Sequence, residues 1–420
     1  MKALRSFEDL LPVIRRGARI VIHSAAAQPR WLTEQLALWG PSLETVTVDV
    51  LMPMEPLPFT ALVPDHFTIH AWFPGRGLRN LAPSSGVEHL RYPLSQIPGL
   101  YATGVCRPNV LFLHLSPPDR HGCLSLGVAV DYMPAVLATR PLVVAEIDPA
   151  MPHTGGSTCL KWDQVDYWVI SDTGPVEGLS RAADEKDCMI AQRVAERIPD
   201  GATLETGVGA IPDAVLRTLA TSPPRNLGIH TGILTDAVLD LIQTGHVTNA
   251  NKPVYPGKTV ATMAVGTKVL YAMLDNSNAI AFHSCDLTHH PRVLAALPRL
   301  CAINSALQVD LGGRVNAEHI QGRVIAGPGG LPDFAKAAQA SPTGLSIIAL
   351  RATSRDGTTS NIVPHLPQGA PVTLEPDHVD LVVTEFGAAD LRGLSPVRRA
   401  RALIAVAHPG FRDSLSRSIA

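Results

Sequence analysis

The chain has 420 residues, of which 46% are hydrophobic and 17% are charged, and its formal net charge is −2 at pH 7. This length predicts two or three domains rather than a single core. The apolar content excludes a disordered chain, and the balanced charge gives no electrostatic reason to expect nucleic acid or an anionic membrane as partner. A small soluble ligand is therefore the expected partner.

Charged residues interrupt the N-terminal segment, so it lacks the apolar run of a signal peptide. No stretch approaches the ~20 apolar residues of a membrane span, and we expect a cytoplasmic protein. The six cysteines form no C-x-x-C pair, and we expect reduced, mostly buried thiols that bind no metal. The adjacent His289 and His290 are expected to lie in a solvated loop.

Short β-branched apolar runs alternate with longer amphipathic stretches in the first half of the chain, which is typical of repeated βα units around parallel sheets. A helix is predicted over 31–39, and buried strands are predicted over 19–25, 45–52, 109–116, 141–147 and 167–172. Because most of these runs are almost continuously apolar, we expect both faces of the strands to be covered.

Residues 173–187 are polar, charged and interrupted by Gly and Pro, which predicts a linker between an N-terminal domain (1–180) and a C-terminal domain (188–420). The second half predicts a helix over 188–198, a strand and a helix on either side of the glycines near 207, and a closing helix interrupted at Pro409. Further strands are predicted over 258–265, 324–330, 345–350 and 381–386.

Two glycine-rich junctions between a predicted strand and a predicted helix are the first candidates for a binding site. The first contains Gly207, Val208 and Gly209, and the second contains Gly327, Gly329 and Gly330. Glycines permit positive φ and close backbone approach, and a helix N-terminus offers unpaired N–H groups to an anion or an oxyanion. For each loop alone, a tight turn required by the fold is the competing interpretation.

Two further polar positions follow predicted strands. His230, in LGIHTG, is a candidate general base, although a single histidine at a strand end is more often structural. Near the C-terminus, Glu385 has Arg392 close by in the sequence, and we interpret these two residues as a structural ion pair.

Taken in order, several segments resemble the acetyl-CoA hydrolase/4-hydroxybutyrate CoA-transferase family. They include SPPDRHGCLSLGVAVD, EIDPAMPHTGGST, DGATLETGVGAIPDAVL, LGIHTG, INSALQVDLGGRVNAE, AGPGGLPDF and VVTEFGAADLRG. The resemblance implies a class I CoA-transferase fold: an α/β protein with two similar CoA-transferase-like (NagB/RpiA-like) domains, whose mostly parallel sheets are covered by helices. It also implies acyl-CoA and a small carboxylic acid as substrates, no cofactor, and a homodimer or larger homo-oligomer.

In that family, a glutamate in a motif like G-I-H-T-E-M attacks the acyl-CoA thioester, and a glutamyl-CoA thioester then forms. Gly232 stands at this position here, so the usual nucleophile is missing. Glu205 stands where the family usually has glutamine, on a strand end that the family fold places beside the G-I-H-T motif. The resemblance therefore makes Glu205 and His230 the candidate catalytic residues, and the glycine loops the candidate CoA-binding or oxyanion site.

Three hypotheses remain open at this point. In the first, Glu205 replaces the missing nucleophile or acts as a base for water, which a pKa raised by burial would suit; alternatively, Glu205 only replaces a hydrogen-bonding glutamine. In the second, an acyl-CoA hydrolase or transferase works by direct attack, and the glycine loops stabilise the oxyanion. In the third, the chain is a catalytically inactive acyl-CoA-binding homologue or a partner subunit.

Overall fold

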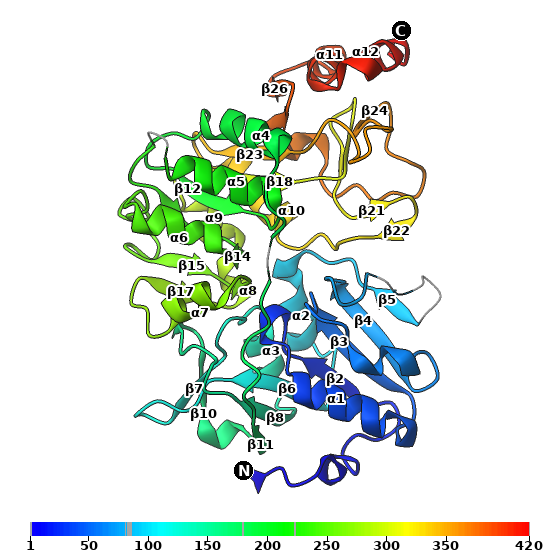
Figure 1. The fold of residues 1–420 in the computed structure, drawn as a ribbon, viewed down its shortest axis with the longest axis vertical. Coiled ribbons are helices and arrows are strands. Elements are labelled where there is room, and N and C mark those ends of the chain that lie inside the picture. Colours follow the sequence, from blue (N-terminus) through cyan, green and yellow to red (C-terminus); the bar gives the residue numbers. More distant parts are fainter. Residues whose placement is uncertain (1, 80, 82–85, 179, 222–223, 420) are drawn as a thin grey trace. The chain divides into compact units, whose positions relative to one another are not determined.

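The computed structural model describes residues 2–79, 81, 86–178, 180–221 and 224–419. The chain forms two compact units (Figure 1). The N-terminal unit comprises Met1–Leu179, Val260–Thr288 and Val324–Gly329, and the C-terminal unit comprises Ser180–Thr259, His289–Arg323 and Gly330–Ala420. The first break lies near the predicted boundary at residue 180, but two later segments return to the N-terminal unit.

The predicted continuous C-terminal domain over 188–420 therefore needs correction, because backbone pairing ties the returning segments to the N-terminal unit. Strand β17 (Ile280–Phe282) pairs in parallel with β9 (Gly155–Gly156). Further along, the Cys285 N–H donates to the Asp131 carbonyl at 2.8 Å. The second returning segment is held in the same way, since the Leu94 N–H donates to the Gly329 carbonyl at 2.8 Å.

An eight-stranded parallel sheet forms the centre of the N-terminal unit. In spatial order its strands are β1 (Lys2–Ala3), β11 (Tyr167–Ile170), β8 (Leu142–Ile147), β6 (Val110–Leu115), β2 (Arg19–Ile22), β3 (Val46–Leu51), β4 (Phe67–Phe73) and β5 (Val87–His89). All five predicted strands of this half occur, most with shortened ends. Every residue of β6 is buried, as expected for a parallel strand covered on both faces.

In the part of the chain that the structure describes, the other longer elements of the N-terminal unit are five helices and a short ribbon. The helices are α1 (Arg30–Trp39), α2 (Ile97–Ala102), α3 (Met133–Ala138), α7 (Lys268–Leu274) and α8 (Cys285–Thr288). A short antiparallel ribbon is made by β7 (Cys123–Ser125) and β10 (Cys159–Lys161). One helix prediction for this half, over 31–39, is confirmed by α1.

A six-stranded sheet forms the centre of the C-terminal unit, and its last strand is antiparallel to its neighbour. In spatial order the strands are β13 (Gly228–Ile229), β12 (Thr203–Thr206), β18 (Leu300–Ser305), β23 (Leu345–Ala349), β25 (Leu381–Thr384) and β26 (Gly387–Asp390). The helices are α4 (Glu185–Ala195), α5 (Ala210–Leu219), α6 (Asp236–Gln243), α9 (Pro291–Ala295), α10 (Leu331–Ala340), α11 (Pro396–Val406) and α12 (Pro409–Arg417). Both units are thus α/β with mainly parallel central sheets (Figure 1).

Local sequence signals set several helix boundaries in the C-terminal unit. Asp184 caps α4 by accepting from the Asp187 N–H, in a reciprocal capping box. Pro409 begins α12 and separates it from α11, as the sequence predicts. The strand predicted over 324–330 is wrong, because only Arg323–Val324 is extended, as β22, and the glycines after it form a loop that leads into α10.

The cysteine prediction is also wrong in part. Cys123 and Cys159 form a disulfide, although they lie 36 positions apart in the sequence. Cys106, Cys285 and Cys301 are buried thiols as predicted, whereas the Cys188 thiol is exposed. The described part of the chain contains no helix with the length and apolar character needed to cross a membrane.

Candidate active site

Glu205 lies on one defined face of the C-terminal sheet. It belongs to β12, where its register partner on β18 is Ala302. Ala302 is buried in the same cluster as Phe334 and Ala338 of α10. Because register partners on neighbouring parallel strands point to the same face, the Glu205 side chain faces the side of the sheet that α10 covers.

The Glu205 carboxyl is almost completely buried, with 4% of the residue exposed. Asn304, two residues after Ala302 on the same face, donates a hydrogen bond from Nδ2 to Glu205 Oε2 at 2.7 Å. Burial raises the pKa of Glu205 to about 8, and the hydrogen bond from Asn304 offsets only part of that effect. Most Glu205 side chains are therefore protonated at pH 7.

His230 and His289 both lie against Phe334 in the same unit. The two imidazole centroids are 6.4 Å and 4.8 Å from the Phe334 ring centroid, and both rings meet it edge to face. His289 is fully buried, so the predicted solvated loop is wrong for this residue. Burial and the neighbouring His230 lower the pKa of His289 to about 3, which keeps its imidazole neutral.

His290, in contrast, is the N-cap residue of α9. Its Nδ1 accepts a hydrogen bond from the Arg292 N–H at 3.1 Å, at the start of α9. Adjacent residues point in different directions, so the cap turns His290 outward while His289 enters the core. Only His289 therefore belongs to the candidate site.

The imidazole of His289 borders the position of the missing nucleophile. A Cβ atom at Gly232 would lie 3.2 Å from His289 Nε2 and 4.0 Å from Phe334 Cε2. A Cβ atom at Gly330 would lie only 2.5 Å from the same nitrogen. The two glycines thus make room for His289: a Cβ atom at 330 would force a rearrangement, and one at 232 would require the imidazole to move by a few tenths of an ångström.

The first glycine loop needs its glycines for two different reasons. Gly209 has φ of 140°, a conformation that residues with a Cβ rarely adopt, directly before α5 begins. At Gly207, a Cβ atom would lie 2.7 Å from Asn304 Oδ1. The loop is therefore packed against the same asparagine that binds Glu205.

A cavity of about 1250 Å³ lies beside this loop, within the C-terminal unit. Val208 and Gly209 line it, together with Ser305, which directly follows Asn304. Its other lining residues include Arg181, Arg351 and Arg355. The volume exceeds the ~300–1,000 Å³ of an ordinary ligand pocket, and guanidinium groups suit phosphate oxygens. Glu205 and His230 are not among the lining residues.

The second glycine loop is divided between the two units. Gly327 and Gly329 belong to the N-terminal unit, where a Cβ atom at Gly327 would lie 2.6 Å from the carbonyl oxygen of Trp72. Gly330 belongs to the C-terminal unit and starts α10 beside His289. Close packing thus accounts for the glycines at 327 and 330.

The predicted pair of Glu385 and Arg392 is not formed. Arg392 donates from Nη2 to Asp390 at 2.5 Å, because the two residues share the turn after β26. Glu385 instead accepts a hydrogen bond from the Ala352 N–H at 2.9 Å. Its carboxyl therefore fixes the backbone after β23, in agreement with a structural role but with a different partner.

Of the predicted catalytic residues, Glu205 and His230 both lie in the C-terminal unit, and the structure adds Asn304 and His289 to them. Period-two alternation from Ala302 places Asn304 on the Glu205 face, so the sequence held a signal for it. No local pattern marks His289, whose burial depends on two distant glycines. Glu205, with a pKa raised to about 8, is the group that can exchange a proton near neutral pH, whereas the His289 imidazole stays neutral.

Comparison with known proteins now gives the family. Residues 1–178 match the model of the acetyl-CoA hydrolase/transferase N-terminal domain, and residues 266–419 match that of the C-terminal domain. The 4-hydroxybutyrate coenzyme A transferase of Clostridium kluyveri is 37% identical over 83% of this chain and 81% of its own length.

Two solved structures extend this likeness to the fold. RipA from Yersinia pestis is 30% identical, with a TM-score of 0.91 over 98% of this chain and 96% of its own. The 4-hydroxybutyrate CoA-transferase from Porphyromonas gingivalis is 32% identical, with a TM-score of 0.81 over 98% and 95% of the two chains. The predicted CoA-transferase-like fold is confirmed. The chain belongs to the acetyl-CoA hydrolase/transferase family, as an acyl-CoA-processing enzyme of the transferase or thioester hydrolase type.

Proposed function

We propose that this enzyme cleaves an acyl-CoA thioester by direct attack of water, without a glutamyl-CoA thioester at position 232. Two observations on the C-terminal unit carry the proposal together. Gly232 offers no carboxylate, and the His289 imidazole borders the space beside it. On the neighbouring strand, Glu205 is a buried carboxyl whose pKa is raised to about 8.

In the proposed reaction, the ionised Glu205 carboxylate removes a proton from water as the water oxygen attacks the thioester carbonyl carbon. The C–S bond then breaks, CoA leaves as a thiolate, and the proton held by Glu205 passes to the sulfur. The products are a carboxylic acid and CoA, and atoms and charge balance. The Gly207 N–H already donates to the Ile303 carbonyl, so the backbone N–H groups of Val208 and Gly209 would stabilise the oxyanion, which is worth about 3–4 kcal/mol for a good donor.

The cavity beside the loop supports CoA as the ligand. Arg181, Arg351 and Arg355 line it and could meet phosphate oxygens at one side, and the glycine loop lies at another. Arg351 is held by Asp184 and Asp187, with Nη2 to carboxylate distances of 2.6 and 2.8 Å. Its side chain is thereby preorganised, so little conformational entropy would be lost on binding.

The test measures released CoA, released acid and intact-protein mass during incubation with a panel of acyl-CoAs. We expect CoA release in water without any added acid, and no CoA-sized mass adduct on the protein. An adduct on a carboxylate would contradict direct attack and identify a relocated glutamyl thioester. Turnover that requires an added carboxylic acid would make the enzyme a transferase, as the names of its relatives describe for those proteins.

A second candidate function is a non-catalytic acyl-CoA-binding homologue, and Gly232 with the buried His289 favours it specifically. An inactive relative would lack the nucleophilic glutamate, as this chain does at Gly232, and another side chain, here His289, would border the space that the glutamate leaves. This candidate predicts that acyl-CoA raises the unfolding temperature while no product forms. Turnover by the purified chain, however slow, would exclude this candidate, provided that a single-residue change abolishes that turnover.

We also propose that the enzyme works in the cytoplasm as a homodimer or larger homo-oligomer, with no cofactor for the reaction and a small carboxylic acid as product or acceptor. The support is the resemblance in sequence to the relatives described above. Light scattering on the purified chain measures the oligomeric state, and a monomeric mass with full turnover would contradict it.

A further inference from the structure

The structure brings together three potential metal ligands of the N-terminal unit, Asp119, Cys123 and His153, away in sequence from every residue of the candidate active site, and Cys159 is bonded to one of them. We call these three residues together with Cys159 the thiol–histidine cluster. We propose that this cluster is a zinc site that forms when the disulfide between Cys123 and Cys159 is reduced. The sequence expectation of no metal site rested on spacing along the chain, which does not register ligands from separate segments.

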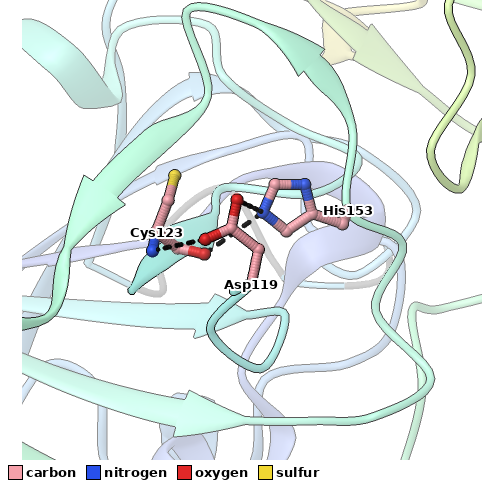
Figure 2. Close-up of side chains that lie close together, drawn as sticks. All are labelled: Asp119, Cys123 and His153. Atoms are coloured by element: carbon pink, nitrogen blue, oxygen red, sulfur yellow. Dashed lines mark hydrogen bonds and ion pairs between the residues drawn. The ribbon is translucent and has the colours of Figure 1, made fainter. Parts of the chain in front are cut away.

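The geometry of the cluster suits a small cation (Figure 2). The ligand atoms of Asp119, Cys123 and His153 all lie within 4.8 Å of one another. His153 Nε2 is 3.9 Å from Asp119 Oδ2 and 3.1 Å from the Cys123 carbonyl oxygen, and on metal binding this nitrogen would lose its proton and exchange the carbonyl contact for the metal. Bonds to zinc of about 2.0–2.3 Å in a tetrahedron place ligand atoms roughly 3–4 Å apart, so the three need to move inward by about 1 Å.

Cys159 supplies the fourth ligand. Its sulfur is bonded to that of Cys123, and the two Cα atoms are 5.5 Å apart. The residues start the two strands of the ribbon formed by β7 and β10, which pair in antiparallel register at Ser125 and Cys159. Because Cys159 lies opposite Ser125 and Cys123 opposite Lys161, the two cysteines are diagonal neighbours on one face of the ribbon, and backbone pairing keeps their thiols close after reduction.

The backbone around the other two ligands is fixed by hydrogen bonds. Asp119 Oδ1 accepts from the N–H groups of His121 and Cys123, at 2.8 and 2.9 Å, which closes the turn before β7. The His153 N–H donates to Asp275 Oδ1 at 2.8 Å. Such supporting contacts hold the donors in place without the metal, as in protein metal sites generally.

The donor set selects the metal. Two thiolates and an imidazole favour a borderline or soft ion, and a tetrahedral set of sulfur, nitrogen and one carboxylate oxygen is typical of zinc rather than of magnesium or calcium. In a reducing compartment, paired cysteines more often bind a metal or act in redox chemistry than remain as a structural disulfide. The cluster would then be a structural site that links the β7–β10 ribbon to the segment at His153.

Conversion of the disulfide into the zinc site needs an external reductant, which we specify as a low-molecular-weight dithiol. The dithiol transfers two electrons and two protons, the S–S bond breaks, and the reagent is oxidised to its own disulfide. Zn²⁺ then displaces the two thiol protons and binds both thiolates. Cys159 is exposed and lines a cavity of about 440 Å³, so a small dithiol can reach its sulfur.

The experiment titrates Co²⁺, as a coloured substitute for zinc, into the full-length protein before and after reduction by the dithiol. We expect about one tightly bound Co²⁺ per chain, only after reduction, with the thiolate charge-transfer absorption and intense visible bands of tetrahedral cobalt. Added Zn²⁺ should displace it. Absence of these bands in the reduced protein, or equal binding by the oxidised protein, would overturn the proposal.

Single substitutions identify the ligands. Cys159→Ser should abolish the charge-transfer bands that belong to a two-thiolate site, and His153→Gln, which keeps a donor for the Cys123 carbonyl, should weaken Co²⁺ binding at least about tenfold. Cys188→Ser is the matched control, since it removes an exposed thiol on α4 and should change nothing. Thermal unfolding checks that each variant is folded. Unchanged spectra in folded Cys159→Ser would also overturn the assignment.

Discussion

Each unit buries a carboxyl group on a parallel strand of its central sheet, and the two carboxyl groups have different hydrogen-bonding partners. In the N-terminal unit, Asp49 of β3 accepts from Arg19 Nη1 at 3.1 Å and from the Tyr101 hydroxyl at 2.7 Å. In the C-terminal unit, Glu205 of β12 accepts from the neutral amide of Asn304. A cation balances the charge of Asp49, whereas the surroundings of Glu205 favour the protonated acid.

This comparison separates a structural carboxyl from one suited to proton transfer. A buried charge with a cationic partner contributes to the fold and is costly to disturb. A buried carboxyl without such a partner has a pKa near neutrality, which is what general acid–base chemistry requires. The comparison predicts that changes at Asp49 act on stability and changes at Glu205 act on turnover.

The largest effect is expected from Glu205→Gln. Removal of a general base lowers turnover by about 100- to 1,000-fold, while the amide still accepts from Asn304, so the unfolding temperature changes little. Rates of CoA release measure the loss. The matched control is Glu146→Gln, another buried carboxyl with a pKa raised by burial, which accepts from the Leu32 N–H at 2.7 Å. An equal loss of turnover in the control would remove the distinction.

The reverse result is expected for Asp49→Asn. Without the carboxylate, Arg19 loses its partner in a largely buried setting, and we expect the protein to be destabilised by about 2–3 kcal/mol. Denaturant unfolding followed by fluorescence measures this change. Turnover per folded molecule should stay within about twofold. As a control, Asp240→Asn breaks the exposed pair with Arg217 and should cost less than about 1 kcal/mol.

The pH dependence tests the state of Glu205. With a pKa of about 8, roughly a tenth of the carboxyl is ionised at pH 7 and roughly nine-tenths at pH 9, so turnover should rise about tenfold. In stability the sign is opposite. The folded protein keeps the proton up to about pH 8 and the unfolded chain releases it near 4.5, so this contribution is complete below pH 4.5 and is lost as the pH rises to 8.

The measurement is the unfolding temperature of wild type and Glu205→Gln between pH 5 and pH 9, with turnover recorded over the same range. The stability of the variant should depend less on pH, because glutamine does not titrate. Parallel stability curves together with a flat rate profile would show that Glu205 does not titrate in this range.

The smallest effects are expected at the glycines beside His289. Gly330→Ala places a Cβ atom 2.5 Å from His289 Nε2 and should destabilise the protein by about 1–3 kcal/mol. Gly232→Ala places one at 3.2 Å and should cost less, about 1 kcal/mol or below. Thermal unfolding of the two variants gives the order. A larger cost at 232 would mean that His289 is not held where the structure has it.

Much of the fold could be predicted from the sequence because its central strands are short, continuous apolar runs bounded by polar residues. The runs near Val110 and Leu142 had one reasonable interpretation, and the glycine at 209 required the turn that the structure contains. The family likeness also identified Glu205 and the empty position at Gly232. The strands and the turn could be predicted because the residues within each segment determine them.

The rest depended on contacts between distant segments. His289 is buried because Gly232 and Gly330, each more than 40 positions away, leave room for its ring. Cys123 and Cys159 meet because their strands pair, and pairing partners cannot be read from a run of residues. The return of residues 260–288 depends on a parallel pairing with two glycines at 155 and 156, which carry no strand signal of their own.

That return has a consequence for biosynthesis. Val260–Thr288 and Val324–Gly329 complete the N-terminal unit, so its last component leaves the ribosome only after 329 of the 420 residues have been joined. Nascent chains usually fold domain by domain from the N-terminus. Here the first unit must wait, with strand edges open, while most of the second is translated. Expression of residues 1–178 alone should therefore yield an incomplete, aggregation-prone fragment, and co-translational chaperone capture should be strongest before residue 329 emerges.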